Sequence, residues 1–359
     1  MMQNKTALDK LDHIKKCIRL SKPIQGLHLE NSDFRGLDLS EAIFNECYLS
    51  GSNFSACNLS QVKFISCDLN QSQFIQSQLA QSAFIQCKMR SCDFREISLK
   101  LDCWTECDLS ESNWENVQLN RNSFIHCQIH HANFASSQLT RCVLLACTVE
   151  ESDFTDAHFN QSVINKIDLS HVKLAGLTAC ETVLINADLH GQNLDHLHFE
   201  KCSLQGANLS DAQLRNATMT ACNFIGAQFI RTQMQGISAE NSHFMSAKFD
   251  SAILDDSALK HSLFQEAIVC NSSFKNADLS MSVWNKSCLA DVDFSSAKMQ
   301  HSHFEHAQGV RIDFSKTKLD FGKFHGASLV TASERGASKR HISKTDKKQL
   351  AAQIRAQQI

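Results

Sequence analysis

A large apolar residue occupies every fifth position of this chain from Ile24 to Leu329. The register covers 62 consecutive positions, since (329 − 24)/5 + 1 = 62, and no insertion breaks it. Three of these positions hold smaller residues: Ala179, Ala239 and Gly309. Of the 23 phenylalanines, 22 lie in this large column, as do all three tryptophans, and Phe321 is the exception. A helix needs apolar residues three or four apart, so the pattern excludes a long helix and predicts a repeat architecture.

A second column, two residues before the first, holds small residues such as Ala42, Cys47 and Ser52. Residues two apart on an extended chain point to the same side, so each block of five buries one small and one large side chain. Strict alternation cannot continue through an odd period, and each block must therefore end in a corner. Glycine often occurs two residues after the large one, where a turn sometimes needs positive φ.

Blocks such as NADLS and GANLS resemble the A(D/N)LXX motif of the pentapeptide-repeat family, over roughly residues 22–330. The resemblance implies an all-β fold, a right-handed quadrilateral β-helix with four blocks, and so 20 residues, in each coil. The register then gives about 15 coils. Serine and cysteine replace much of the alanine of the motif, and phenylalanine replaces alternate leucines, but both changes keep the size classes.

The register predicts three segments: an N-terminal cap over 1–22, a solenoid over 23–330 and a basic tail over 331–359. Leu8, Leu11, Ile14 and Ile18 form one side of an amphipathic helix, which we expect to cover the first coil because an open sheet edge invites aggregation. The tail contains seven basic and two acidic residues, and it also carries a weak helical pattern. We expect a solvated tail or an end cap, with a nucleic-acid patch as the alternative.

The cysteines and the termini bear on the compartment. Eleven of the 16 cysteines lie in the small column, where a free thiol packs like a slightly large alanine, so we expect a reduced protein. The thiols expected to be more reactive point outward: Cys103, Cys180, Cys270 and Cys288. No signal peptide or membrane span is apparent. The sequence predicts a cytoplasmic protein and leaves export without a signal open.

Residues 20 apart should stack on one face of the coil, which sorts the outward residues. The face of Phe44 and Phe64 carries most of the outward apolar residues, and we predict that it binds a protein partner or a second copy of the chain. The predicted contact residues are Ile43, Ile65, Ile85, Ile125, Val143, Leu145, Val163, Val183, Ile185 and Ile225. Two adjacent faces are acidic, and on one of them Glu111, His131 and Glu151 should form a charge ladder.

One inward position breaks the pattern, because Asp102 occupies the small column. A buried carboxylate must be protonated or hydrogen-bonded, and Asn122 and Ser82 on the adjacent coils are the expected partners. We interpret Asp102 and Asn122 as a structural polar pair rather than a functional site.

No motif for catalysis or cofactor binding is apparent. None of the 17 histidines has another histidine 20 residues away, so stacked coils would not present paired imidazoles to a metal. His196 and His198, and the group around His303, are weak candidates only. No phosphate-binding loop or nucleophile motif occurs. We expect no enzyme, no cofactor, no metal and no small-molecule substrate.

Two functions compete. The first is a non-catalytic scaffold that presents a rigid surface to protein partners. The opening is similar to repeat proteins found beside type VI secretion components, which suggests an accessory role there: SKPIQGLHLENSDFRGLDLSEAIF. The second is a DNA mimic that binds DNA gyrase, as fluoroquinolone-resistance members of the family do. Duplex DNA carries about one charge per 1.7 Å, which is far denser than the charge of this coil.

Overall fold

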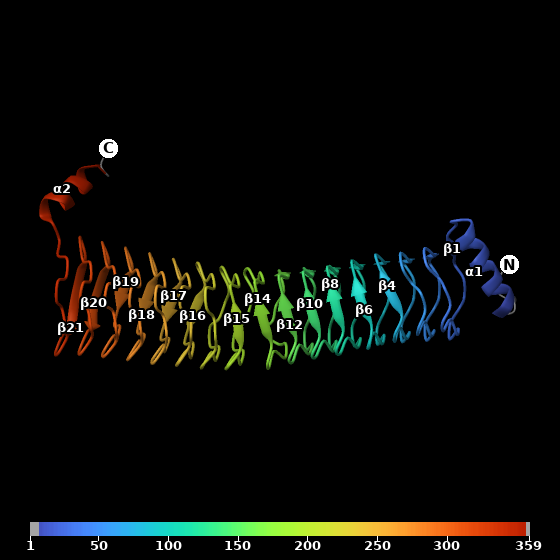
Figure 1. Ribbon diagram of the computed structural model, residues 1–359, viewed down its shortest axis with the longest axis horizontal. Helices are drawn as coiled ribbons and strands as arrows, with labels where there is room; N and C mark the ends of the chain where they lie inside the picture. The colour runs from blue at the N-terminus through green and yellow to red at the C-terminus, as the bar shows by residue number, and fades with distance from the viewer. Residues whose placement is uncertain (1–6, 357–359) are drawn as a thin grey trace. The chain divides into compact units, whose positions relative to one another are not determined.

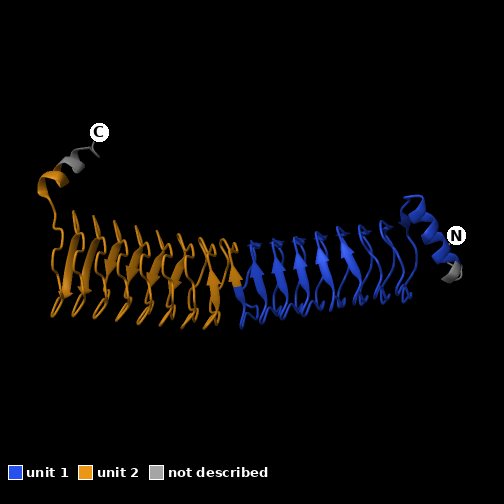
Figure 2. Ribbon diagram, viewed as in Figure 1, with its two compact units in different colours: residues 1–178 blue, residues 179–359 orange. Residues whose placement is uncertain are grey.

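The computed structural model describes residues 7–356 and divides into two compact units, Met1–Thr178 and Ala179–Ile359 (Figure 2). Both units are parallel β-solenoids, and together they contain about 16 coils (Figure 1). Helix α1 (Ala7–Arg19) belongs to the first unit and helix α2 (Lys347–Ala356) to the second. The all-β solenoid predicted from the five-residue period is confirmed.

Each coil returns to the same place after 20 residues. The first coils pair in parallel at four stations: His28 with Tyr48, Asp33 with Asn53, Asp38 with Asn58, and Ile43 with Lys63. Four stations for 20 residues mean one block on each of four sides, as the sequence predicts. Backbone hydrogen bonds join successive coils at each station, for example from the Leu49 N–H to the Asp68 carbonyl at 2.6 Å.

Corners between blocks are built from residues with positive φ. The corner residue lies two positions after each large residue, and non-glycine side chains hold it at most corners, for example Glu41 (φ 60°), Leu101 (φ 65°) and Arg121 (φ 58°). This conformation costs about 1–2 kcal/mol for a residue with a side chain. The sequence predicts positive φ only at some corners, whereas the structure uses it at nearly all of them.

The aspartate or asparagine before the large residue holds the turn that follows it. The Asn53 Oδ1 accepts a hydrogen bond from the Ser55 N–H at 2.9 Å, and Asp93 accepts one from the Arg95 N–H at 3.1 Å. Such side chains imitate a backbone turn. The polar second position of the A(D/N)LXX motif is therefore structural, a role that the sequence analysis does not assign.

In the first unit the strands form two parallel sheets on different sides of the coil. The sheet over the Phe44 face runs β1 (Ile24–Gln25), β2 (Ile43–Asn45), β3 (Lys63–Ile65), β5 (Ala83–Ile85), β7 (Cys103–Thr105), β9 (Ser123–Ile125), β11 (Val143–Leu145) and β13 (Val163–Asn165). The second contains β4 (Gln78–Ala80), β6 (Ser98–Lys100), β8 (Gln118–Asn120), β10 (Gln138–Thr140) and β12 (His158–Asn160). Strand β14 (Thr178–Cys180) spans the boundary, with Thr178 in the first unit and its other two residues in the second.

The second unit holds β15 (His198–Glu200) and one six-stranded parallel sheet. That sheet runs β16 (Gln228–Ile230), β17 (Lys248–Asp250), β18 (Ile268–Cys270), β19 (Cys288–Ala290), β20 (Gln308–Asp313) and β21 (Ser328–Ser333). The coil continues beyond the boundary predicted at residue 330, because the Phe324 N–H donates to the Ser343 carbonyl at 2.8 Å. Glu334 and Lys339 occupy large-column positions there and form an ion pair, which hides the extra coil from a hydrophobic pattern.

The core is a pair of stacked columns. Phe54 and Phe74 stack with ring centroids 5.2 Å apart and an interplanar angle of 7°, and the same arrangement recurs through both units. In the small column, thiols and hydroxyls donate to carbonyls 23 residues earlier, as Cys57 does to Phe34 (2.7 Å) and Ser72 to Leu49 (3.0 Å). Serine and cysteine can therefore replace alanine, because each satisfies its own polar group.

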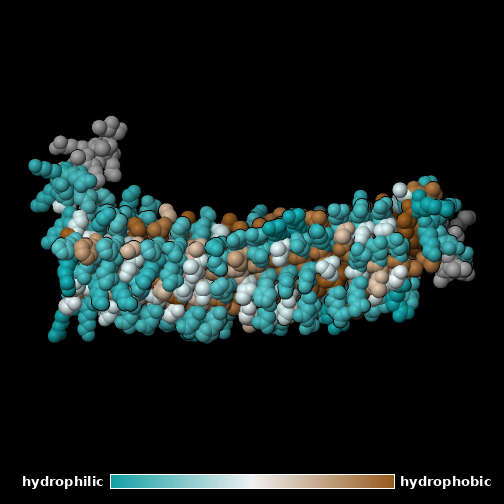
Figure 3. All heavy atoms as spheres, viewed as in Figure 1, coloured by the Kyte–Doolittle hydropathy of each residue, from teal (hydrophilic) through white to brown (hydrophobic). Residues whose placement is uncertain are grey.

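Helix α1 covers the first coil, as predicted. The Ile14 side chain is fully buried, and the Lys10 Nζ donates to the His28 carbonyl at 2.6 Å. Apolar atoms gather where the helix lies against the coil (Figure 3). The side chain of Leu8, which the amphipathic pattern also includes, lies outside the described residues. The cap removes an open sheet edge at this end.

Candidate functional site

An apolar row crosses the sheet over the Phe44 face of the first unit. In β3, β5, β7, β9 and β11, the parallel register aligns the outward residues Ile65, Ile85, Thr105, Ile125 and Leu145. We call these five residues the central row. Ile85 is 36% exposed and its four neighbours are half-buried, as expected for side chains standing on a flat sheet.

Three other predicted residues flank the central row on the same sheet. Ile43 lies in β2, and Val143 pairs with Val163 between β11 and β13. All seven predicted contact residues of this unit thus share one sheet, and Lys63 is the sole charged outward residue on its strands β2 to β13. The sheet therefore offers a contiguous, nearly uncharged surface.

Acids predominate on one side of this sheet and bases on the other, although Lys166 lies after the strands and Glu41 before them. Glu46 and Glu106 occupy corners after the strands, and Arg121 and Arg141 occupy corners before them. Glu106 accepts a hydrogen bond from Gln86 at 2.9 Å, and Arg141 donates to Gln161 at 2.8 Å. Within the described residues none of these four charges has an ion-pair partner within 4.0 Å. Both rims remain electrostatically available.

The three predicted contact residues in the second unit do not form a comparable row. Val183 pairs with Ser203, which pairs in turn with Asn223, so polar residues follow the valine along the stack. The coil positions of Ile185 and Ile225 are likewise separated by Gln205. The coherent apolar surface is thus a property of the first unit.

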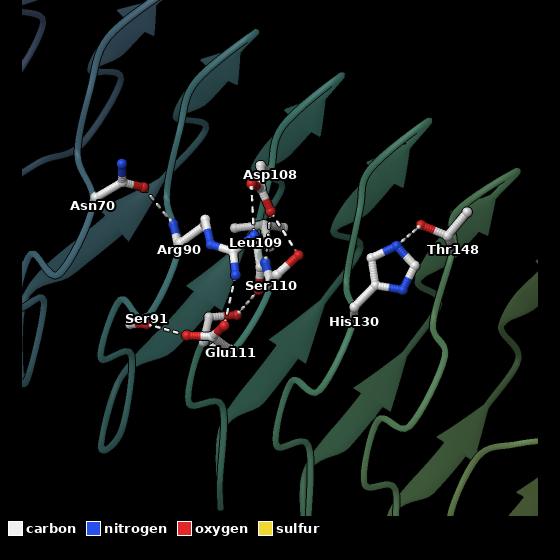
Figure 4. Close-up of polar contacts among 10 residues, drawn as sticks. Asn70, Arg90, Ser91, Asp108, Leu109, Ser110, Glu111, His130 and Thr148 are labelled. Carbon is white, nitrogen blue, oxygen red and sulfur yellow. Dashed lines mark hydrogen bonds and ion pairs between the residues drawn. The ribbon is translucent and has the colours of Figure 1, made fainter.

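A polar face of the first unit carries hydrogen-bonded ladders (Figure 4). Arg90 donates to the Glu111 carboxylate at 2.6 Å, and the Ser91 hydroxyl donates to the same group at 2.8 Å. His131 and Glu151 approach within 3.2 Å. The predicted ladder is therefore correct for the pair of His131 and Glu151, whereas Glu111 turns toward Arg90. Hydrogen bonds from Ser91 and Arg90 lower the pKa of Glu111.

Asp102 is buried and fully engaged, as predicted. Its carboxylate accepts hydrogen bonds from the Ser82 N–H (2.8 Å), the Lys100 N–H (2.9 Å) and the Asn122 side-chain amide (3.1 Å). Burial raises the pKa of Asp102 despite these donors. The indole N–H of Trp104, two residues on, is buried without a partner. The three donors all belong to the coil backbone or core.

The ladder of hydrogen bonds is interrupted in the first unit at Asp168. No hydrogen bond joins Val149 or Cys147 to Asp168 in the described chain, although the corresponding bond from Ile129 to Thr148 is 2.7 Å on the preceding coil. A groove of about 420 Å³ lies there, lined in part by Val149 and Glu150. Ile167 lies in the small column at this coil, where the preceding coils have thiols. A large residue in a small position can force neighbouring coils apart.

The described residues contain no group of three or more His, Cys, Asp or Glu side chains that could hold a metal ion, and no helix among them could span a membrane. All 16 cysteines are free. Burial raises the pKa of the inward Cys57 and Cys142 thiols to about 11, whereas outward Cys288 is exposed. The thiols of Cys57 and Cys142 therefore remain protonated donors.

Coils of four five-residue blocks with stacked large and small columns define a parallel β-solenoid of the pentapeptide type. A family model described as pentapeptide repeat region matches residues 25–102 and 101–184, and one described as pentapeptide repeats (8 copies) matches residues 182–220 and 222–259. Together the matches cover well over half of the chain. The chain belongs to the pentapeptide repeat proteins. A comparison with curated proteins found no significant match.

Solved structures with related coils include trypsin-treated QnrB1, a plasmid-mediated fluoroquinolone resistance protein (26% identity, 44% of this chain and 83% of that chain, TM-score 0.29). HetL from Nostoc sp. strain PCC 7120, involved in heterocyst differentiation regulation, is 17% identical over 95% of each chain, with a TM-score of 0.24. The A-module of the Azotobacter vinelandii mannuronan C-5 epimerase AlgE6 is 8% identical over 94% of this chain and 95% of that chain, with a TM-score of 0.23. Similarities of this size carry no functional information.

Proposed function

We propose that the protein is a non-catalytic interaction scaffold that binds other proteins through the central row of its first unit. The observation that carries this proposal is the alignment of Ile65, Ile85, Ile125 and Leu145 across five adjacent strands. A coil can be built without them, because the outward positions of its other sheets are mostly polar. An apolar surface that does not serve the fold is typical of a binding site.

A second copy of the chain fits this surface. If one copy turns by 180° about an axis parallel to the stack of coils and packs face to face, its arginine rim meets the glutamate rim of the other. Glu106 of one copy then approaches Arg121 of the other, while the two central rows pack together. Such an interface is isologous, so it closes as a dimer and does not polymerise.

The size of the sheet sets the expected affinity. Seven strands about 4.8 Å apart and about 10 Å wide present roughly 350 Å² on each copy. Stable dimers bury about 800 Å² on each partner, so this surface alone supports weak association in the micromolar range or above. The resemblance of residues 21–44 to proteins found beside type VI secretion components makes such a component the first heterologous partner to test.

Sedimentation equilibrium at micromolar concentrations tests the proposal. The double variant Ile85→Lys/Ile125→Lys should be monomeric where the wild type associates, because four lysines would face one another across the dimer. Ile268→Lys, which changes an exposed isoleucine on β18 of the second unit, is the matched control and should associate normally. A monomeric wild type, or association that survives the double substitution, would contradict the proposal.

The DNA-mimic alternative depends on acidic surface, and many of these acids already have structural roles. Asp33 accepts hydrogen bonds from the backbone and guanidinium of Arg35, which hold its pKa at about 2. Asp211 and Arg231 form a similar pair between coils. Carboxylates held in turns and ion pairs project little net charge, unlike the phosphates of DNA. A gyrase supercoiling assay with a fluoroquinolone separates the alternatives, since a scaffold without gyrase affinity leaves inhibition unchanged.

A further inference from the structure

A column of exposed rings runs along one corner of the second unit, near its C-terminal end. His301 stacks on Phe321 with centroids 4.9 Å apart and an interplanar angle of 4°, and Phe321 stacks on His341 at 5.2 Å and 20°. All three are corner residues with φ between 54° and 63°. Phe321 is 48% exposed, and it is the one phenylalanine outside the large column. The core therefore does not explain it.

The column ends in a free ring face. His341 lies on the last coil, whose backbone ladder ends at Ser343, and α2 begins at Lys347. Among the described residues, its single ring contact is with Phe321. One face of the imidazole is thus stacked and the other is available to a further planar group.

Cations flank the column on both sides. Lys318 lies three residues before Phe321, Lys323 lies two residues after it, and Arg340 adjoins His341. The Asp320 carboxylate also adjoins Phe321, where it accepts a hydrogen bond from the Arg340 N–H at 2.7 Å. Lys318 pairs in the ladder with Lys298, which places two like charges on adjacent coils. Within the described residues neither Lys318 nor Lys323 has an ion-pair partner within 4.0 Å. Adjacent like charges destabilise a sheet, so they do not serve the coil itself.

The segment around the column is basic although the chain is acidic. Residues 298–348 contain 11 Lys and Arg and 5 Asp and Glu, which gives 11 − 5 = +6, whereas the whole chain has a net charge of −3. Stacked rings beside unpaired cations are the two features that bind single-stranded nucleic acid without sequence preference. A duplex hides the faces of its bases and could use only the charges.

We propose that this corner binds single-stranded nucleic acid, with one base extending the ring column on the free face of His341 and the phosphates lying against Lys318, Lys323 and Arg340. The site is independent of the central row. The sugar contributes nothing to this geometry, so DNA and RNA single strands should both bind.

Fluorescence anisotropy with labelled oligothymidine and oligouridine of about 15 nucleotides tests the site. Stacking of one base on a ring contributes enough binding free energy that His341→Ala should weaken binding by about fivefold or more. His341→Phe keeps a ring at this position and should retain binding. Leu101→Ala is the matched control, because Leu101 is an exposed residue at the same corner in the first unit and also has positive φ. It should bind like the wild type.

The charges have their own readout. Lys318→Gln/Lys323→Gln should reduce the slope of log affinity against log salt by about 1.4, since each phosphate contact on a single strand contributes about 0.7. Lys248→Gln removes an exposed lysine elsewhere in the unit and should change the slope little. The proposal is wrong if the wild type fails to bind either oligonucleotide at about 50 mM salt. It is also wrong if His341→Ala and Leu101→Ala bind alike, if a duplex binds as well as a single strand, or if anionic lipid vesicles compete fully for the site.

Discussion

Replacing Asp102 with alanine should destabilise the first unit more than most single substitutions. The carboxylate is the shared acceptor of three donors: the Ser82 N–H at 2.8 Å, the Lys100 N–H at 2.9 Å and the Asn122 amide at 3.1 Å. Alanine fits the small column but accepts no hydrogen bond. The perturbation therefore isolates the loss of an acceptor from any change in packing.

The expected loss follows from the number of orphaned donors. A buried donor without a partner costs about 1–3 kcal/mol. The Lys100 amide is only partly buried and can turn to water, so two donors, those of Ser82 and Asn122, count in full. The free energy of unfolding should fall by about 2–5 kcal/mol. The free energy recovered because a carboxylate is no longer buried reduces this loss.

Serine at position 102 is the matched control. Ser162 lies on the same side of the coil, where its hydroxyl accepts from the Cys142 N–H at 3.0 Å and donates to the Leu139 carbonyl at 2.9 Å. Serine in place of Asp102 can do the same between Ser82 and Leu79. Asp102→Ser leaves only the Asn122 amide without its acceptor, so it should cost about 1–3 kcal/mol, less than Asp102→Ala.

Urea unfolding followed by tryptophan fluorescence measures these differences. A Trp284→Phe background confines the signal to Trp104 and Trp114 of the first unit, and phenylalanine suits the column because Phe264 and Phe304 stack on either side. If Asp102→Ala proves as stable as Asp102→Ser, the hydrogen-bond account of this position is refuted.

The pH dependence provides a second test of Asp102. Burial raises its pKa in the folded state above the ordinary value of 3.8, so the folded protein binds this proton more tightly than the unfolded chain does. The contribution of Asp102 to stability is full below the ordinary pKa and is lost as pH rises through the raised one. Relative to Asp102→Ser, the wild type should therefore gain stability as pH falls from 7 toward 4.

Three further predictions concern the coil. Phe94→Ala should lower the free energy of unfolding by about 3–5 kcal/mol in the same urea assay, because a fully buried ring of the stack is lost. Gly51→Ala should cost about 1–3 kcal/mol by thermal unfolding, since φ is +70° and the new Cβ would lie 2.4 Å from the Asn31 Oδ1; an unchanged midpoint would contradict the strain. Ile167→Cys should close the groove beside this residue, and hydrogen exchange at the Val149 amide should slow. Exchange as fast as in the wild type would show that the bulk of Ile167 is not the cause of the groove.

Much of the fold follows from the sequence because one period governs it. The positions of Phe44 and Phe64 fix which residues face inward, and the 20-residue coil that the family resemblance implies then aligns Ile65 with Ile85. The partners of Asp102 follow from the same arithmetic.

The features that the sequence does not predict lie where the five-residue period no longer determines the residue type. The last coil uses the Glu334–Lys339 ion pair where apolar residues are expected, so its inward positions look like a solvated tail. The column through Phe321 occupies corners, whose identity the register leaves free. The groove beside Ile167 lies where the small column holds a larger side chain. A pattern that separates only apolar from polar residues does not distinguish isoleucine from cysteine.

Site-specific photocross-linking tests the interaction surface most directly. A benzophenone amino acid at position 125 places the reactive group within the central row, and the same amino acid at Gln118, an exposed outward position of β8, places it on another side of the same unit. The purified protein irradiated at micromolar concentration should give a covalent dimer from position 125 and almost none from position 118. Equal yields from both positions, or none from 125, would contradict the assignment of the central row as the contact surface.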